Sequence, residues 1–152
     1  KSGFLLNNEL TDFSFATHDE AGYPIANRVE PGKRPRSSMA PTIVMKDGKP
    51  ALVIGSPGGS SIIGYVAQAV IAYLDWDMNV QQAVAMPHLL NRFGTYDIEA
   101  GTDAEAMAAP LEAMGYKVKI GPQTSGLQAI AIEDGMLYGG ADPRREGIAL
   151  GE

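Results

Sequence analysis

The sequence predicts an α+β fold in which a mainly antiparallel or mixed sheet carries helices layered on it. Three observations predict it. The expected elements run in the order strand, hairpin, helices, strand, hairpin; two Asp-Gly turns lie between apolar segments; and a long segment between these turns has apolar residues at helical spacing. This order does not fit a doubly wound parallel sheet, in which strands and helices alternate. With 152 residues, 45% of them hydrophobic, the chain is long enough to bury a core.

The first third of the chain is expected to hold one strand, one long connection and one hairpin. Residues 3–8 are apolar enough for a short strand, and the polar, Pro- and Gly-containing residues 14–36 form the connection. Connections of this length inside a domain are often functional. The hairpin consists of residues 42–46 and 51–54, because the Asp-Gly pair between them suits the positive φ of tight turns.

Three helices are expected in the middle of the chain. The first runs to Leu74 after a cap at Ser60 or Ser61, and the second covers 80–86 after a cap at Asn79. The third begins with a capping-box pattern at Thr102 and is kinked or split by the proline at position 110.

The last part of the chain returns to strands. A strand is expected over 116–120, and a second hairpin over 127–132 and 136–138 around another Asp-Gly turn.

Composition excludes several classes of function. The net charge of −6, from 12 basic and 18 acidic residues, argues against a nucleic-acid partner. The chain has no cysteine, so neither a disulfide, a thiolate zinc site nor a cysteine nucleophile can form. His18 and His88 are too far apart in the sequence to indicate a metal site, and no metal or organic cofactor is indicated. No apolar run reaches the roughly 18 residues of a membrane span.

Two polar segments contain candidate binding residues. Glu9 and Asp12 follow the first expected strand and could both face a cation, but their spacing alone favours a turn closed by Asp12 and a solvated Glu9. Ser37 and Ser38 could hold a carboxylate, but their spacing alone favours an ordinary serine turn before a strand.

A glycine-rich segment at 55–60, the glycine loop, connects an expected strand to a helix. Gly58 and Gly59 could offer backbone N–H groups to an anion or an oxyanion, or they could simply form a turn; the two interpretations are about level. Neither a P-loop nor a dinucleotide-binding motif is present. No Gly-x-Ser-x-Gly motif supports a Ser-His-Asp triad, so His88 is expected to be a structural or surface residue.

Taken together, four segments resemble the small subunit of γ-glutamyltransferases (γ-glutamyltranspeptidases). They are Leu5–Phe13, Gly32–Thr42, Ser56–Ser60 and Asp142–Arg144, in the order of that family. The resemblance implies a partial αββα sandwich of the N-terminal-nucleophile hydrolase type. It also implies that residues 1–152 are a single domain fragment, most of a small subunit, that begins partway through a longer protein and lacks the segment with the threonine nucleophile.

The resemblance assigns roles to the candidate residues. Glu9 and Asp12 match positions that bind the α-ammonium of the glutamyl group, and Ser37 and Ser38 match those that bind its α-carboxylate. Gly58 and Gly59 match the N–H donors of the oxyanion hole.

The resemblance also implies partners and a setting for the chain. The partners are a γ-glutamyl donor such as glutathione and the large subunit of the same precursor, in a periplasmic or secreted protein. The isolated chain is expected to be inactive and to self-associate through exposed sheet edges.

Three other functions remain open. A cephalosporin or glutaryl acylase and a polyglutamate depolymerase share the fold, and a non-catalytic amino-acid-binding protein could keep the same residues. The γ-glutamyl function ranks first, because a glutaryl substrate has no ammonium for Glu9 and Asp12 to bind.

Overall fold

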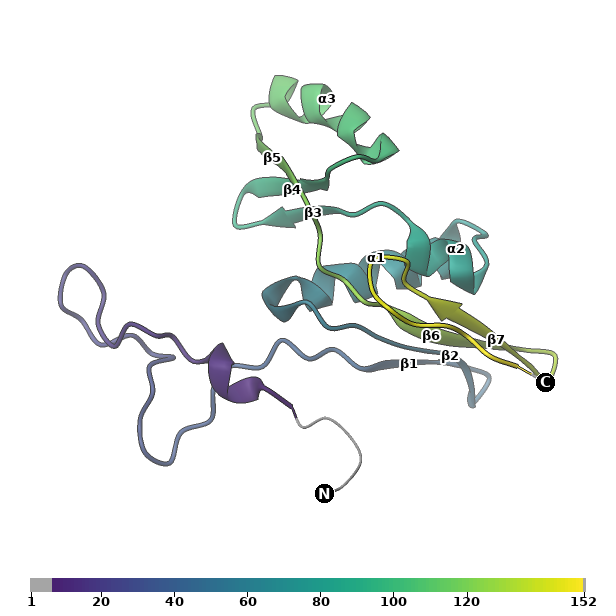
Figure 1. The fold of residues 1–152 in the computed structure, drawn as a ribbon, viewed down its shortest axis with the longest axis horizontal. Helices are drawn as coiled ribbons and strands as arrows, with labels where there is room; N and C mark the ends of the chain where they lie inside the picture. Colours follow the sequence, from purple (N-terminus) through teal and green to yellow (C-terminus); the bar gives the residue numbers. More distant parts are fainter. Residues whose placement is uncertain (1–6, 152) are drawn as a thin grey trace. The chain divides into compact units, whose positions relative to one another are not determined.

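The computed structural model describes residues 7–151, and the chain forms two compact units, residues 1–38 and 39–152 (Figure 1). Most of the strand expected at 3–8 lies outside the described residues, and Asn7 and Asn8 are in neither a helix nor a strand. Within residues 7–151, no helix has both the length and the hydropathy needed to cross a bilayer.

Residues 7–38 of the first unit form a loop structure with one short helical turn. A 3₁₀ helix, η1, covers Glu9–Asp12, and only two isolated bridges follow it, between Ser14 and Arg28 and between His18 and Pro24. The expectation of a long connection over 14–36 is therefore confirmed. Hydrogen bonds from side chains to the backbone order this connection; the Asp19 carboxylate, for example, accepts from the N–H of Tyr23 at 2.8 Å.

The second unit is built on a four-stranded antiparallel sheet in the order β1-β2-β6-β7 (Figure 1). The strands are β1 (Thr42–Lys46), β2 (Lys49–Gly55), β6 (Gln128–Glu133) and β7 (Met136–Ala141). Both expected hairpins are confirmed. In each turn the Asp and the Gly have positive φ, near 51° and 77° in the first and 50° and 82° in the second, as type I′ turns require.

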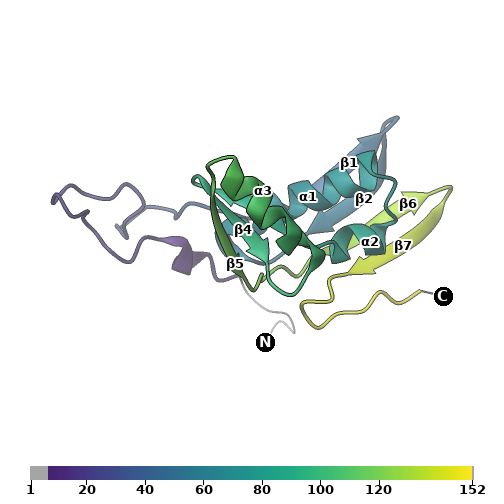
Figure 2. The same ribbon diagram turned by 90° about the horizontal axis from the view of Figure 1, so that it is seen from above.

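Two helices cover one face of this sheet. Helix α1 (Ile62–Asp75) contacts β2, and α2 (Val80–Ala85) contacts β6 and β7 (Figure 2). Alternate residues of the central strands point toward the helices, as the two-residue period of a strand requires. The buried core comprises Leu52 and Ile54 of β2, Ala129 and Ala131 of β6, and helical residues that include Tyr65, Val66, Ala69, Val80 and Val84.

The opposite face of the sheet is apolar but exposed. Ile43, Val53 and Ile130 are paired across β1, β2 and β6 and are 60%, 40% and 46% exposed; they form the outer apolar row. A sheet with helices on one face and an uncovered apolar face is half of a sandwich. This arrangement confirms the expected α+β fold, a mainly antiparallel sheet with helices layered on it.

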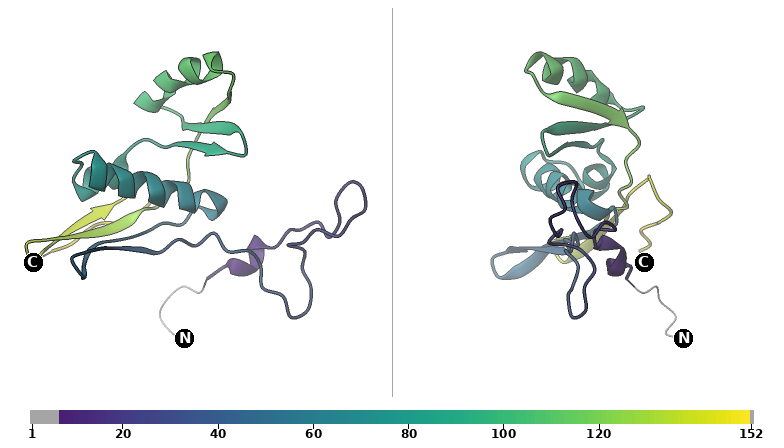
Figure 3. Two further views of the ribbon diagram at one scale, coloured as in Figure 1. Left: turned by 180° about the vertical axis from the view of Figure 1, so that it is seen from behind. Right: turned by 90° about the vertical axis from the view of Figure 1, so that its left-hand side faces the viewer.

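A second, three-stranded sheet was missed by the sequence prediction. Its order is β3 (Leu89–Arg92), β4 (Thr95–Glu99), β5 (Lys117–Gly121), with β3 antiparallel and β5 parallel to β4. Figure 3 shows α1 and α2 between the four-stranded sheet and this second sheet. Only the β5 segment was expected, because β3 and β4 are short and Phe93, at φ 52°, is an unusual residue for a tight turn.

The crossover from β4 to β5 contains the third expected helix in two parts. The 3₁₀ helix η3 (Asp103–Met107) leads into α3 (Ala108–Ala113), so the stretch is in two parts. The change lies ahead of Pro110, which is inside the first turn of α3 and not at the split that was expected of it. The prediction of a capping box at Thr102 is wrong, because the Thr102 side chain forms no cap hydrogen bond. The Thr102 hydroxyl donates to the Glu99 carbonyl oxygen at 2.8 Å, and the Glu105 carboxylate accepts from the N–H of Gly101 instead.

The expected cap of α2 is confirmed, and that of α1 is wrong. The Asn79 side chain accepts from the N–H of Gln82 at 2.9 Å, and the Gln82 side chain accepts from the N–H of Asn79 at 3.0 Å. Ser61 stands at the N-terminus of α1 without a side-chain cap bond, because its hydroxyl and that of Ser60 accept from Arg92.

The substitution Asn79→Ala should destabilise the second unit by about 1 kcal/mol, because one N–H group of the first turn of α2 loses its acceptor. Urea denaturation followed by circular dichroism measures the change. Asn79→Ser is the matched control and should keep most of the stability, since serine caps helices nearly as well as asparagine. Equal losses in the two variants would show that the cap bond does not stabilise α2.

Candidate functional site

Two segments of the first unit that the sequence singled out are in contact. The Ser37 hydroxyl donates a hydrogen bond of 2.6 Å to the Glu9 carboxylate, although the two residues are 28 positions apart. Glu9 and Asp12 are partly exposed on η1, and Ser38 beside Ser37 is buried. These four residues are called the donor clamp below. Among the described residues the Asp12 carboxylate has neither a hydrogen-bond partner nor an ion pair, so it is available to a cation.

Asn27 joins the two halves of the donor clamp. Its side-chain amide donates to the carbonyl oxygen of Asp12 at 2.7 Å, and its side-chain oxygen accepts from the N–H of Arg36 at 2.9 Å. Its own carbonyl oxygen accepts from the N–H of Ser14 at 2.9 Å. Asn27 therefore holds the backbone beside both parts of the clamp. The sequence analysis missed it, since one asparagine in a polar connection carries no pattern.

The glycine loop has a conformation that requires glycine at Gly58 and favours it at Gly59. Gly58 has φ 136° and Gly59 has φ 58°. A Cβ atom added at Gly58 would lie 2.7 Å from Cε2 of Tyr65, so the backbone there packs directly against the ring. Within residues 7–151 the N–H groups of both glycines donate to no protein acceptor. The loop thus presents two free donors just ahead of α1, which suits an anion.

The glycine loop is anchored to the segment that precedes β6. The Ser56 hydroxyl accepts from the N–H of Gly126 at 3.1 Å. A Cβ atom at Gly126 would lie 2.8 Å from Cγ of Pro57, so the two backbones approach closely. The position of the loop therefore depends on residues far along the sequence.

A buried ionic cluster lies behind this segment. Arg144 forms a two-pronged ion pair with Glu99, at 2.5 and 2.6 Å, and a further one with Asp142 at 3.0 Å. It also donates to the carbonyl oxygen of Met86 at 2.9 Å. Burial alone would raise the pKa of Glu99 and of Asp142. For Glu99 the hydrogen bond from Arg144 lowers it, and for Asp142 the bonds from Ser125 and from backbone N–H groups do, so both pKa values lie below their usual range.

His88, Ser125 and Asp142 are connected, but not as a catalytic triad. Nε2 of His88 lies 2.8 Å from Oγ of Ser125, and Ser125 donates its proton to Asp142 at 2.6 Å. The serine therefore stands between the histidine and the carboxylate, whereas a nucleophilic serine gives its proton to the histidine. His88 and Ser125 are buried, so of the two expected roles for His88, structural or surface, the surface one is excluded.

His88 is an uncharged part of this cluster. Burial, and then the positive charge of Arg144, lowers its pKa to about 4, although Glu99 and Asp142 act in the opposite direction. Nδ1 of the neutral ring lies 3.2 Å from the side-chain oxygen of Gln68, and Nε2 lies beside Ser125. No group of three or more His, Asp or Glu side chains in residues 7–151 is placed to bind a metal ion.

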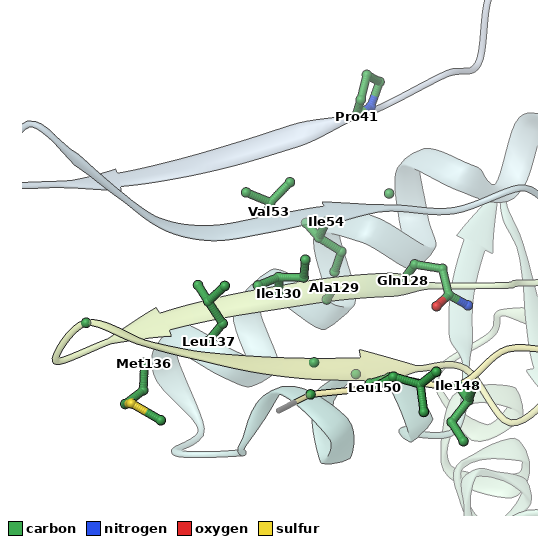
Figure 4. A pocket seen from close by; sticks show the side chains of 16 residues that line it. Pro41, Val53, Ile54, Gln128, Ala129, Ile130, Met136, Leu137, Ile148 and Leu150 are labelled. Carbon is green, nitrogen blue, oxygen red and sulfur yellow. The ribbon is translucent and has the colours of Figure 1, made fainter.

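A pocket outside the candidate site lies on the uncovered face of the four-stranded sheet (Figure 4). Its volume is about 830 Å³, and it is lined mainly by apolar side chains, including Val53, Ile130, Leu137, Ile148 and Leu150. It contains no charged side chain that could bind a zwitterionic substrate. We assign it to the uncovered sheet face and not to the candidate site.

The donor clamp belongs to the first unit and the glycine loop to the second. The contact between Glu9 and Ser37 lies within the first unit, and the two free N–H donors lie within the second. The structure therefore places Ser37 beside Glu9 in the first unit, and Gly58 and Gly59 with free N–H groups in the second.

Comparison with known proteins gives a consistent result over the whole chain. The family model described as Gamma-glutamyltranspeptidase matches residues 1–152. The chain is 40% identical to the glutathione hydrolase proenzyme of Bacillus subtilis strain 168, covering 98% of this chain and 25% of the relative. It is 42% identical to that of Escherichia coli K12, covering 95% and 26%. The chain thus spans about a quarter of the length of the curated relatives it matches.

Two further similarities bear on function. The acylase ACY 1 proenzyme of Pseudomonas sp. strain SE83 is 35% identical, covering 98% of this chain and 26% of the relative. Among solved structures, the γ-glutamyltranspeptidase of Pseudomonas nitroreducens in complex with L-DON has a TM-score of 0.79 at 33% identity, covering 99% of this chain and 83% of that chain.

The low pKa of His88 predicts a loss of stability in weak acid. In the unfolded state His88 has a pKa near 6.5 and binds a proton below that pH. In the folded state its pKa is about 4, so it stays neutral until the pH is much lower. Stability is therefore fully present above pH 6.5 and falls as the pH is lowered toward 4, by at most about 3 kcal/mol. Urea denaturation at several pH values between 7.5 and 5 measures this slope before the carboxylates begin to protonate.

The control variants are His88→Gln and His18→Gln. His88→Gln should flatten the slope, while His18→Gln should leave it unchanged, because His18 is exposed. Parallel slopes for the wild type and His88→Gln would contradict the assignment.

Proposed function

Because the chain belongs to the γ-glutamyltranspeptidase family over residues 1–152, we propose that it is most of the small subunit of an autoprocessed γ-glutamyltransferase. Its coverage of 83% of the Pseudomonas nitroreducens chain and of only 25% of the Bacillus subtilis proenzyme supports this extent. The remainder of the precursor supplies the large subunit and the segment with the threonine nucleophile. The absence of cysteine is compatible with the periplasmic or secreted setting that we propose.

The proposed reaction is cleavage of a γ-glutamyl amide, such as glutathione, and transfer of the γ-glutamyl group to water, an amino acid or a peptide. The threonine hydroxyl attacks the γ-carbonyl carbon while the α-amine of the same threonine accepts the proton. The amide bond then breaks, and the amine leaves with that proton. The acceptor finally attacks the γ-glutamyl ester and releases the threonine.

The observation that carries the proposal is the bond between Ser37 and Glu9. A carboxylate and a hydroxyl that bind each other in the free protein are the two partners that a zwitterion needs. An incoming ammonium takes the Glu9 carboxylate, and the released Ser37 hydroxyl turns its proton to the substrate carboxylate. Asp12, which has no partner among the described residues, adds a second negative charge for the ammonium.

In this reaction the glycine loop forms the oxyanion hole. The N–H groups of Gly58 and Gly59 are fixed by the backbone and donate to no acceptor within residues 7–151. Donors held in place before the reaction stabilise the negative oxygen that develops on the γ-carbonyl group, without a cost of reorganisation.

The acylase function is the alternative that the comparisons keep open, since the chain is 35% identical to acylase ACY 1. The two carboxylates of the clamp argue for a γ-glutamyl substrate, because a glutaryl group carries no ammonium. A non-catalytic amino-acid-binding protein would bind glutamate without turnover.

Two chromogenic donors that differ only in the α-amine distinguish these functions in the processed enzyme expressed from its full precursor. γ-Glutamyl-4-nitroanilide should be cleaved much faster than glutaryl-4-nitroanilide, and the isolated chain should cleave neither. Asp12→Asn should raise KM for the γ-glutamyl donor roughly 10- to 100-fold, because a charge-assisted hydrogen bond to the ammonium is weakened. A preference for the glutaryl donor would favour the acylase, and no turnover would favour the binding protein.

Asn27→Ala should raise KM for γ-glutamyl-4-nitroanilide several-fold with a smaller change in kcat. The variant removes the hydrogen bonds from the Asn27 side chain to the backbone of Asp12 and Arg36, so the two parts of the clamp are no longer held together. The groups that take part in bond cleavage are not changed. Steady-state kinetics separates the two effects, and a thermal melt monitors folding. Asn91→Ala is the control, because within residues 7–151 the Asn91 side-chain oxygen accepts only from the N–H of Gly94 in its own turn. A pure loss of kcat would contradict the positioning role of Asn27.

A further inference from the structure

A small polar pocket of about 260 Å³ lies in the second unit, next to the glycine loop. We call it the cationic pocket, because Arg92 of β3 and Lys119 of β5 both line it. The other lining residues used below are Ser61, Tyr65, Asp97 and Thr124. Two cations therefore face one carboxylate. No residue in the described part of the chain forms an ion pair with either Arg92 or Lys119, so the pocket lining carries a net positive charge.

The cationic pocket and the glycine loop share a wall. A Cβ atom added at Gly58 would lie 2.7 Å from the Tyr65 ring and 3.6 Å from the carbonyl oxygen of Thr124, and both residues line the pocket. The Tyr65 hydroxyl fixes this wall by accepting from the N–H of Thr124 at 3.3 Å. A group that leaves or approaches the loop at Gly58 is therefore within a short distance of the pocket.

Arg92 is held at the edge of the glycine loop. Its Nη1 donates to the Ser61 hydroxyl at 3.1 Å, and its Nη2 donates to the Ser60 hydroxyl. A guanidinium group has five N–H donors in a plane, so donors remain after these two bonds. Ser60 and Ser61 thus fix the orientation of a cation that forms no ion pair with a carboxylate within residues 7–151.

We propose that the cationic pocket binds the carboxylate of the group on the far side of the scissile amide. This is the C-terminal carboxylate of the peptide that leaves during cleavage, or that of the acceptor amino acid or peptide during transfer. Arg92 binds the carboxylate directly, since its planar fork matches two carboxylate oxygens, and Lys119 adds positive charge. The inference rests on the proposed function, because Gly58 and Gly59 mark where the γ-carbonyl group lies.

The test compares two donors that differ by one carboxylate on the leaving group, γ-glutamyl-4-nitroanilide and γ-glutamyl-3-carboxy-4-nitroanilide. In the processed enzyme, Arg92→Gln should raise KM for the carboxylated donor about tenfold and leave KM for the other donor within about twofold. Arg92→Lys keeps the charge and should restore part of the affinity. Lys117→Gln is the control, because Lys117 lies on the same strand as Lys119 and does not line the pocket.

The outcomes separate this inference from the proposed function. Wild-type turnover of both donors, with Arg92→Gln affecting both equally or neither, overturns the cationic pocket alone. Failure of the wild type to cleave either donor overturns the proposed function and this inference with it. Acceptors give an independent measurement: glycylglycine should lose its advantage over glycylglycinamide in Arg92→Gln, and a retained advantage would also overturn the inference.

Discussion

The buried guanidinium of Arg144 is the interaction on which the second unit depends. Arg144, Glu99 and Asp142 have side chains that are 12%, 10% and 0% exposed, so their charges are removed from water together. Removing one partner from such a group leaves an uncompensated charge and costs several kcal/mol, far more than the loss of an exposed ion pair. Through these contacts the end of α2, the end of β4 and the turn after β7 are held at one point.

The same cluster reaches the glycine loop by a continuous path of contacts. Asp142 accepts from Ser125 and from the N–H of Leu127, which fixes the segment ahead of β6. The neighbours Thr124 and Gly126 in that segment pack against Gly58 and Pro57. The position of the glycine loop thus depends on buried charged residues that lie outside the loop.

How far the sequence predicted the structure depended on whether a feature was local. The two Asp-Gly hairpins and the Asn79 cap were predicted correctly because each is decided by a few adjacent residues. The hairpin of β3 and β4 was missed because its short strands gain their stability from pairing with β5, across α3. The cap expected at Ser60 or Ser61 failed because Arg92, distant in the sequence, takes both hydroxyls. The residue types of the donor clamp came from family resemblance, while Asn27 and the direct bond from Ser37 to Glu9 required coordinates.

The outer apolar row bears on the order in which a precursor can mature. In the proposed precursor, the layer that covers Ile43, Val53 and Ile130 belongs to the same polypeptide, so it is present at the millimolar effective concentration typical of a tethered segment. Two separate chains would associate from far lower concentrations, and each would expose an apolar, aggregation-prone surface until they bind each other. A backbone cut made after docking leaves the two pieces held by the buried layer. The same cut made earlier would release a sheet that pairs with copies of itself. An uncut precursor thus protects its own apolar sheet face from aggregation. Cleavage of the peptide bond is therefore expected to follow the packing of the covering layer on this face.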